Sequence, residues 1–110
     1  ELVVTMGKAD QKAKGGRNQE FALASAIRIE GSSRITISSV DSDGTDGPTE
    51  VAGGIADGYT VKRAKKLDVD VFKALFEHNS YEALMKLEDT IFTGSTGTNI
   101  QDLRLIYISD

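Results

Sequence analysis

The sequence predicts an α/β domain of three layers, with helices on both faces of a central mixed β-sheet. Stretches with strand periodicity alternate along the chain with stretches of helical periodicity. Glycine-rich loops fall where a predicted strand passes into the next element, which is where α/β folds collect ligands. The 110 residues, 39% hydrophobic and 27% charged, correspond to one domain with one core.

The first half of the chain contains three predicted elements. The β-prone run at 2–6 predicts a strand, and the polar run at 7–16, which ends in a glycine pair, predicts a loop. Helix formers dominate 17–30, and nearly every position of Phe21–Ile29 is apolar or small, which is typical of a helix packed on a sheet. Alternating polar and β-branched residues at 34–40 predict a strand.

The second half contains three predicted helices and two strands. A helix is expected over 60–66, a second helical stripe over 69–76, and a third helix from Ser80. Short and buried strands are expected over 90–92 and 103–108, respectively. The stretch 51–57 is too rich in glycine to be assigned to either structure.

Composition excludes several classes of function. The 13 basic and 17 acidic residues give a net charge of -4, which argues against a nucleic-acid-binding domain. The absence of cysteine excludes disulfides, thiolate nucleophiles and cysteine-ligated metals, and favours a reducing, cytoplasmic location. No run approaches the ~20 apolar residues of a membrane span. The chain starts at Glu1 and enters a strand pattern at once, which predicts a piece of a longer protein.

The loop KGGRNQE at 14–20 is a candidate anion site. Its two glycines allow close backbone approach, and the unpaired N–H groups of the helix start attract negative charge. Arg17 adds a bidentate donor for carboxylate or phosphate. The alternative is a glycine turn followed by a surface arginine.

The loop DSDGTDGPT at 41–49 crowds Asp41, Asp43 and Asp46 together. Close carboxylates repel one another unless a partner compensates them, and the candidate partners are Mg²⁺ or Ca²⁺, Arg17, or a nest of backbone N–H groups. An EF-hand is excluded because its required glycine position holds Asp46. The alternative is a turn whose side chains bond their own backbone.

The loop GSTGTN at 94–99 offers backbone N–H and hydroxyl groups to a phosphate, or is an ordinary turn before a strand. Neither a Walker A lysine nor the G-x-G-x-x-G dinucleotide fingerprint is present. His78, the single histidine, stands at the end of a helical stripe, where a structural role is expected. The basic cluster of Lys62, Arg63, Lys65 and Lys66 is expected to be a solvated helix face.

Taken in order, these segments resemble the MOFRL domain. The matching stretches are KGGRNQEFALA, SDGTDGPTEVAGGIADG, NSY and TGSTGTNIQDLRLIYI. In that family the domain is the C-terminal part of class II glycerate 2-kinases, many once labelled hydroxypyruvate reductases. The resemblance implies one domain over 1–110 and a missing N-terminal Rossmann-like domain as its partner. Asp41 stands where the family usually has a small residue, so no family role is assigned to it.

The resemblance implies ATP-dependent phosphorylation of D-glycerate at O2 with Mg²⁺, in a cleft of which this domain forms one wall. It implies binding of glycerate or phosphate groups by Arg17, Asn18, Glu20, Thr49, Thr96, Thr98 and Asn99. Asp43 and Asp46 are candidate metal ligands. A general base or nucleophile within this chain is not identified, and the chain alone is expected to be inactive. The alternatives are a non-catalytic ligand-binding or regulatory module and a hydroxypyruvate reductase.

Overall fold

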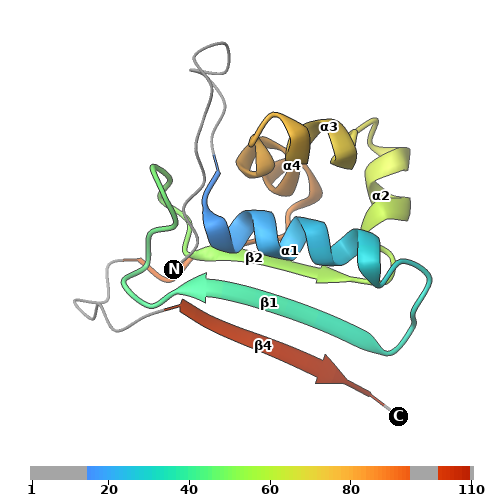
Figure 1. The fold of residues 1–110 in the computed structure, drawn as a ribbon, viewed down its shortest axis with the longest axis horizontal. Coiled ribbons are helices and arrows are strands. Elements are labelled where there is room, and N and C mark those ends of the chain that lie inside the picture. Colours follow the sequence, from blue (N-terminus) through green and yellow to red (C-terminus); the bar gives the residue numbers. More distant parts are fainter. Residues whose placement is uncertain (1–14, 95–101, 110) are drawn as a thin grey trace.

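The structure, a computed structural model, describes residues 15–94 and 102–109. Within them a four-stranded sheet has the order β3-β2-β1-β4 (Figure 1). The strands are β1 (Ile35–Asp41), β2 (Gly53–Asp57), β3 (Thr90–Ile91) and β4 (Asp102–Ile108). The central strand β1 is antiparallel to both neighbours, with Val40 opposite Gly53 on one side and Leu103 on the other.

Four helices pack on one face of this sheet. They are α1 (Arg17–Arg28), α2 (Thr60–Lys66), α3 (Val71–Phe76) and α4 (Ser80–Leu87). A Cβ atom at Gly54 of β2 would meet Leu84 of α4 at 2.8 Å and Ala22 of α1 at 3.3 Å, so both helices lie on the same side of that strand. Among the described residues, no helix is long and apolar enough to cross a membrane.

Two hydrophobic clusters form the core, and the smaller one joins helices to the sheet. Ala26 of α1, Ala56 of β2 and Val61 of α2 form the smaller one. The larger one lies between the helices and consists of Leu23, Ala64, Val71, Ala83, Leu84 and Leu87. Small residues on β2 let α1 approach closely, which fixes the start of α1 next to the β1–β2 loop.

The predicted α/β class is confirmed, and the structure refines its layers. The described sheet is antiparallel throughout, where a mixed sheet was expected, and the described helices cover one face, where two were expected. One reason is that the glycine-rich stretch 51–57 contains β2, so β1 turns back into an antiparallel neighbour before the next helix. The predicted strand at 2–6 lies outside the described residues.

Candidate functional site

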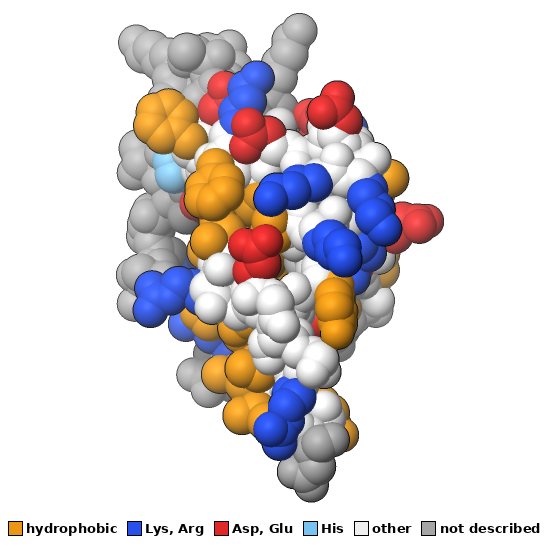
Figure 2. Space-filling view, turned by 90° about the vertical axis from the view of Figure 1, so that its right-hand side faces the viewer, with side chains coloured by type: hydrophobic (Ala, Val, Ile, Leu, Met, Phe, Trp, Pro, Cys, Tyr) orange, Lys and Arg blue, Asp and Glu red, His pale blue; other side chains and the backbone are white. Residues whose placement is uncertain are grey.

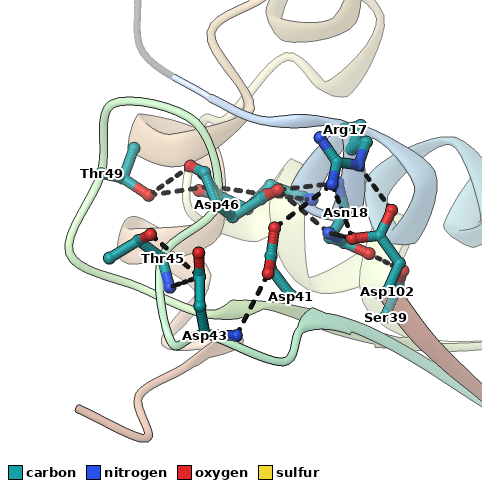
Figure 3. A network of polar contacts seen from close by, with 10 residues as sticks. Arg17, Asn18, Ser39, Asp41, Asp43, Thr45, Asp46, Thr49 and Asp102 are labelled. Atoms are coloured by element: carbon teal, nitrogen blue, oxygen red, sulfur yellow. Dashed lines mark hydrogen bonds and ion pairs between the residues drawn. The ribbon is translucent and has the colours of Figure 1, made fainter. Parts of the chain in front are cut away.

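Asp46 lies in the loop between β1 and β2, and its side chain is fully buried against the first turn of α1 (Figure 3). The backbone N–H groups of Asn18 and Gln19 donate to its two carboxylate oxygens at 3.1 and 2.8 Å. The side-chain amides of the same two residues donate to the same oxygens at 3.1 and 2.9 Å. Because the N-cap residue Gly16 has no side chain to offer, Asp46 caps α1 from a distant loop.

The N-terminus of α1 therefore already binds an anion, and that anion is Asp46. The sequence predicted that these N–H groups would attract an external carboxylate or phosphate; the structure shows two of them bonded to the chain's own carboxylate. For Asp46, the backbone N–H nest is the predicted partner that the structure shows.

Two glycines allow the loop and the helix start to approach this closely. A Cβ atom at Gly16 would lie 2.4 Å from Cγ of Asp46, and one at Gly47 would lie 2.5 Å from the carbonyl oxygen of Gly15. Gly47 also has a φ of +63°, which favours glycine. Thr49 completes the contact, since its hydroxyl donates to the Asp46 carbonyl at 2.8 Å and accepts from Gln19 Nε2 at 3.1 Å.

Arg17 is held at the same end of the sheet by carboxylates from two strands. Its Nε and Nη2 donate to both oxygens of Asp102, the first residue of β4, at 2.5 and 3.0 Å. Nη2 also lies 3.3 Å from Asp41, the last residue of β1 (Figure 3). Because Asp41 and Asp102 are register partners in the sheet, the pairing of β1 with β4 places both carboxylates beside one guanidinium.

The pKa values of the two carboxylates are shifted in opposite directions. Hydrogen bonds from Arg17 hold the pKa of Asp102 below its ordinary value. The pKa of Asp41 is raised, first because the group is buried and then because Asp43 and Asp102 place further negative charge beside it. One guanidinium thus contacts two carboxylates. Asp102 has the better geometry, because it accepts two hydrogen bonds from Arg17 and Asp41 accepts one.

Asn18 connects this pair to the Asp46 cap. Its Nδ2 donates to Asp102 at 3.0 Å as well as to Asp46, and its Oδ1 accepts from the buried hydroxyl of Ser39 on β1. The same amide therefore contacts the loop, β1 and β4. Asn18 is fully buried, and its hydrogen bonds fix the positions of Asp46, Asp102 and Ser39 relative to one another.

Asp43 faces outward from this network. Its Oδ1 accepts from the backbone N–H of Thr45 at 2.8 Å and from the Thr45 hydroxyl at 3.0 Å. These hydrogen bonds lower its pKa. This is the self-bonded Asp turn that the sequence analysis offered as the alternative to a cation site.

The proposed metal pair is not assembled in the described residues. Asp46 already receives four N–H donors and is buried, so Mg²⁺ at that carboxylate would have to displace the cap of α1. Within residues 15–94 and 102–109 no group of three or more His, Asp or Glu side chains is arranged to hold a metal. The assignment of Asp43 and Asp46 to a metal stays a prediction, one that the geometry of Asp46 disfavours.

Glu20 points away from the Arg17 network toward the turn between α3 and α4. Both of its oxygens lie within 3.1 and 3.2 Å of Nδ1 of His78. This pair ties the first turn of α1 to the other helices, in line with the structural role expected for His78. Binding of substrate by Glu20 stays a prediction, as it does for Thr49. The predicted residues Thr96, Thr98 and Asn99 lie outside the described residues.

Sequence reasoning missed Asp102 and Ser39 as members of the site. Asp102 stands inside the quoted stretch TGSTGTNIQDLRLIYI, at the predicted start of a strand, and its position there was the available signal. Ser39 follows Ile35 and Ile37 on the inward side of β1, where a small polar residue indicates a buried hydrogen-bond partner.

Together, the fold and the network define an α/β domain in which an arginine at the end of the sheet contacts two carboxylates. The model of the MOFRL family matches residues 1–102, so the chain belongs to the MOFRL family. Among its relatives, the glycerate 2-kinase of Pyrococcus horikoshii is 47% identical over 87% of this chain. The D-glycerate 2-kinase of Thermotoga maritima is 49% identical over 81% of it.

A solved structure shares the fold. The crystal structure of glycerate kinase from Thermotoga maritima superimposes with a TM-score of 0.89 at 42% sequence identity and covers 99% of this chain. This chain corresponds to 25% of that protein, and to 22% and 21% of the Pyrococcus and Thermotoga relatives above. The chain therefore spans between a fifth and a quarter of the length of the relatives it matches.

Proposed function

We propose that this chain is the C-terminal domain of a glycerate 2-kinase-like enzyme and forms one wall of the cleft in which ATP phosphorylates D-glycerate. The observation that carries the proposal is the match to two glycerate 2-kinases at 47% and 49% identity. Phosphoryl transfer is mostly positioning and charge stabilisation, which a rigidly held guanidinium provides.

In this proposal Arg17 contacts the glycerate carboxylate or a phosphate group from the edge of its guanidinium. Asp102 is a positioning residue because it accepts two hydrogen bonds from Arg17, and Asn18 is one because it donates to Asp102. Arg17 stays partly exposed, at 29% of its side-chain surface. A preset arginine loses little side-chain entropy when the anion binds. Asp41 limits the affinity for anions, since its charge faces the same group.

ATP and Mg²⁺ belong to the proposed complete enzyme, with the missing N-terminal Rossmann-like domain as partner. Since the described residues do not offer a ready metal site and Asp46 is occupied as a cap, no step is assigned to a metal on this chain. The cytoplasmic location likewise stays a prediction from the absence of cysteine.

The proposal is tested by grafting. Residues 1–110 replace the matched quarter of the Thermotoga glycerate kinase, and ADP release is measured with ATP, Mg²⁺ and D-glycerate. We expect turnover in the graft, none in the isolated chain, and a loss on the order of 100-fold on Arg17→Ala. Arg63→Ala is the matched control, because Arg63 also contacts two carboxylates, Asp57 and Asp89, away from the Arg17 network.

The two arginine variants decide the assignment. Equal losses in both would show that Arg17 contributes only to folding. An active graft that ignores Arg17→Ala would remove Arg17 from the site, and an inactive graft with a native melting curve would argue against the kinase itself.

A further inference from the structure

The face of the sheet opposite the helices is apolar along β4 and at the end of the sheet nearest Arg17. On β4, Asp102 and Arg104 point toward α1, where Asp102 contacts Arg17 and Arg104 lies 4.1 Å from the ring of Phe21. Side chains alternate along a strand, so Leu103, Leu105 and Tyr107 point to the opposite face. The register adds Val40, Ile55 and Ile91 of the neighbouring strands, with Ser38 of β1 between Ile55 and Leu105. We call this surface the open sheet face.

The exposure of this face is unusual for a sheet that meets water. The three β4 residues are 58%, 66% and 62% exposed, and Ile106 and Ile108, which point to the other side of this edge strand, are 58% and 64% exposed. Antiparallel sheets with one solvated face usually alternate apolar and polar residues, with the polar ones outward. Here the outward positions of β4 are Leu, Leu and Tyr, which is the pattern of a strand buried on both faces.

The open sheet face is also most apolar next to the Arg17 network. Its row nearest Asp41 and Asp102 consists of Ile91, Gly53, Val40 and Leu103. The row at the opposite end contains Asp57, Thr36 and Tyr107. A protein segment that packs on this row would therefore also lie next to Arg17.

Another exposed apolar surface differs from it in character. Phe72 and Phe76 of α3 are 64% and 87% exposed, and Figure 2 shows hydrophobic side chains beside lysines, arginines and acidic groups on the side where α2 and α3 lie. Charges and apolar groups alternate there over short distances, as on an ordinary solvated surface. In the strand that crosses the open sheet face, the 103–108 segment holds one charge, Arg104, and that charge points to the other side.

We propose that the open sheet face packs against the part of a longer glycerate 2-kinase-like chain that lies outside the matched quarter. This inference rests on the proposed function. The relatives have three to four times as many further residues as this domain contributes. The exposed apolar residues of the face continue up to the site, since the register pair of Val40 and Leu103 is next to the pair of Asp41 and Asp102. Such packing adds the layer that the sequence predicts on the second face of the sheet, and it places the added body at the edge of the cleft.

Thiol labelling tests the proposal, because the chain has no cysteine of its own. Leu105→Cys places one thiol on the open sheet face, and Phe76→Cys places the control thiol on α3. Maleimide labelling, located by mass spectrometry, is followed in the 110-residue chain and in the Thermotoga graft. We expect similar rates at both positions in the short chain, and labelling at position 105 about tenfold slower in the graft, with position 76 unchanged.

Equal labelling rates at position 105 in the short chain and in the graft would overturn the proposal. Protection at position 105 in the short chain that is lost on dilution would identify a second copy as the occupant, and would overturn it too. If the graft does not melt cooperatively, the rest of the Thermotoga protein is added to the short chain as a separate polypeptide. A lack of protection at about 100 μM would then reject the interface.

Activity measured on the same samples separates the two proposals. An active graft without protection at position 105 leaves the kinase assignment standing and removes the interface. A protected but inactive graft keeps the interface and removes the kinase assignment.

Discussion

The two halves of the loop between β1 and β2 carry the same residue types and use them in opposite ways. In the second half, Asp46 is fully buried and receives hydrogen bonds from the backbone and side chains of α1. In the first half, Asp43 accepts a hydrogen bond from Thr45, two residues further on. Just before the loop, Asp41, the last residue of β1, lies beside Arg17 with its pKa raised. Three carboxylates within six residues thus have three roles, and the packing of α1 against the loop separates them.

Among the substitutions that test these roles, Asp46→Asn is expected to lower stability most. An amide turns one oxygen into an N–H donor that faces the N–H groups of Asn18 and Gln19, and the remaining donors lose a charged acceptor. We expect the free energy of unfolding to fall by about 3 kcal/mol. Urea denaturation of the 110-residue chain measures it, with Asp43→Asn as the control, for which the change should stay within about 0.5 kcal/mol. Equal effects of the two substitutions would show that the buried carboxylate does not hold α1 in place.

Gly16→Ala disturbs the contact between Asp46 and the start of α1 from the helix side. The added Cβ would lie 2.4 Å from Cγ of Asp46 and 2.6 Å from its backbone carbon, so the loop has to move. We expect a loss of about 2 kcal/mol, and a smaller loss when the same change is made on top of Asp46→Ala, which frees space. The measurement is a double-mutant cycle by urea denaturation. Additive losses would place the strain elsewhere.

Much of the fold was predictable because its signals are local. The alternation at 34–40 and the helix formers from Arg17 identify β1 and α1 to within two residues at each end, and 60–66 coincides with α2. The strand β2 was not predicted, because its sequence, GGIAD, has low strand propensity and is determined by close contacts with neighbouring strands and helices. A Cβ atom at Gly53 would lie 1.8 Å from the carbonyl oxygen of Ser39. A requirement of this kind exists only once the strands are paired.

The sequence predicted many residues of the site, but few of the pairs that these residues form. The sequence identifies Arg17, Asn18 and the aspartate loop as candidates, with Arg17 as one possible partner of the loop, and the structure brings them together. That Asp46 would take the helix N-terminus, and that Arg17 would pair with Asp102, 85 positions along the chain, depends on the register of β4 against β1. No local pattern encodes that register, so the sequence alone left cation, arginine and backbone partners open.

Asp102→Asn is expected to have the next effect in size. The variant removes the charge that Arg17 contacts through two hydrogen bonds, and because the pair is partly exposed we expect a loss of about 1 kcal/mol at pH 7. The pKa of Asp102 is lowered in the folded state, so its contribution is complete above the ordinary value near 4 and is lost as the pH falls through the lower folded value. Wild type and variant should therefore converge as the pH falls below about 4, as followed by thermal melting. A difference that stays constant across that range would contradict the pairing.

Asp41→Asn is expected to have the smallest effect, and the opposite sign. The pKa of Asp41 is raised by burial and by the charges of Asp43 and Asp102, so its ionised form costs stability at neutral pH. A carboxyl group of this kind binds its proton more tightly in the folded chain, and the cost disappears as the pH falls through the raised value. Against this gain, the variant gives up a charged contact of 3.3 Å with Arg17. Because Asp102 keeps the guanidinium in place through two better bonds, we expect the gain to prevail, with a stabilisation of up to about 0.5 kcal/mol at pH 7 that vanishes below about pH 4. Urea denaturation at both pH values measures it, and a clear loss of stability at pH 7 would show that Arg17 depends on both carboxylates equally.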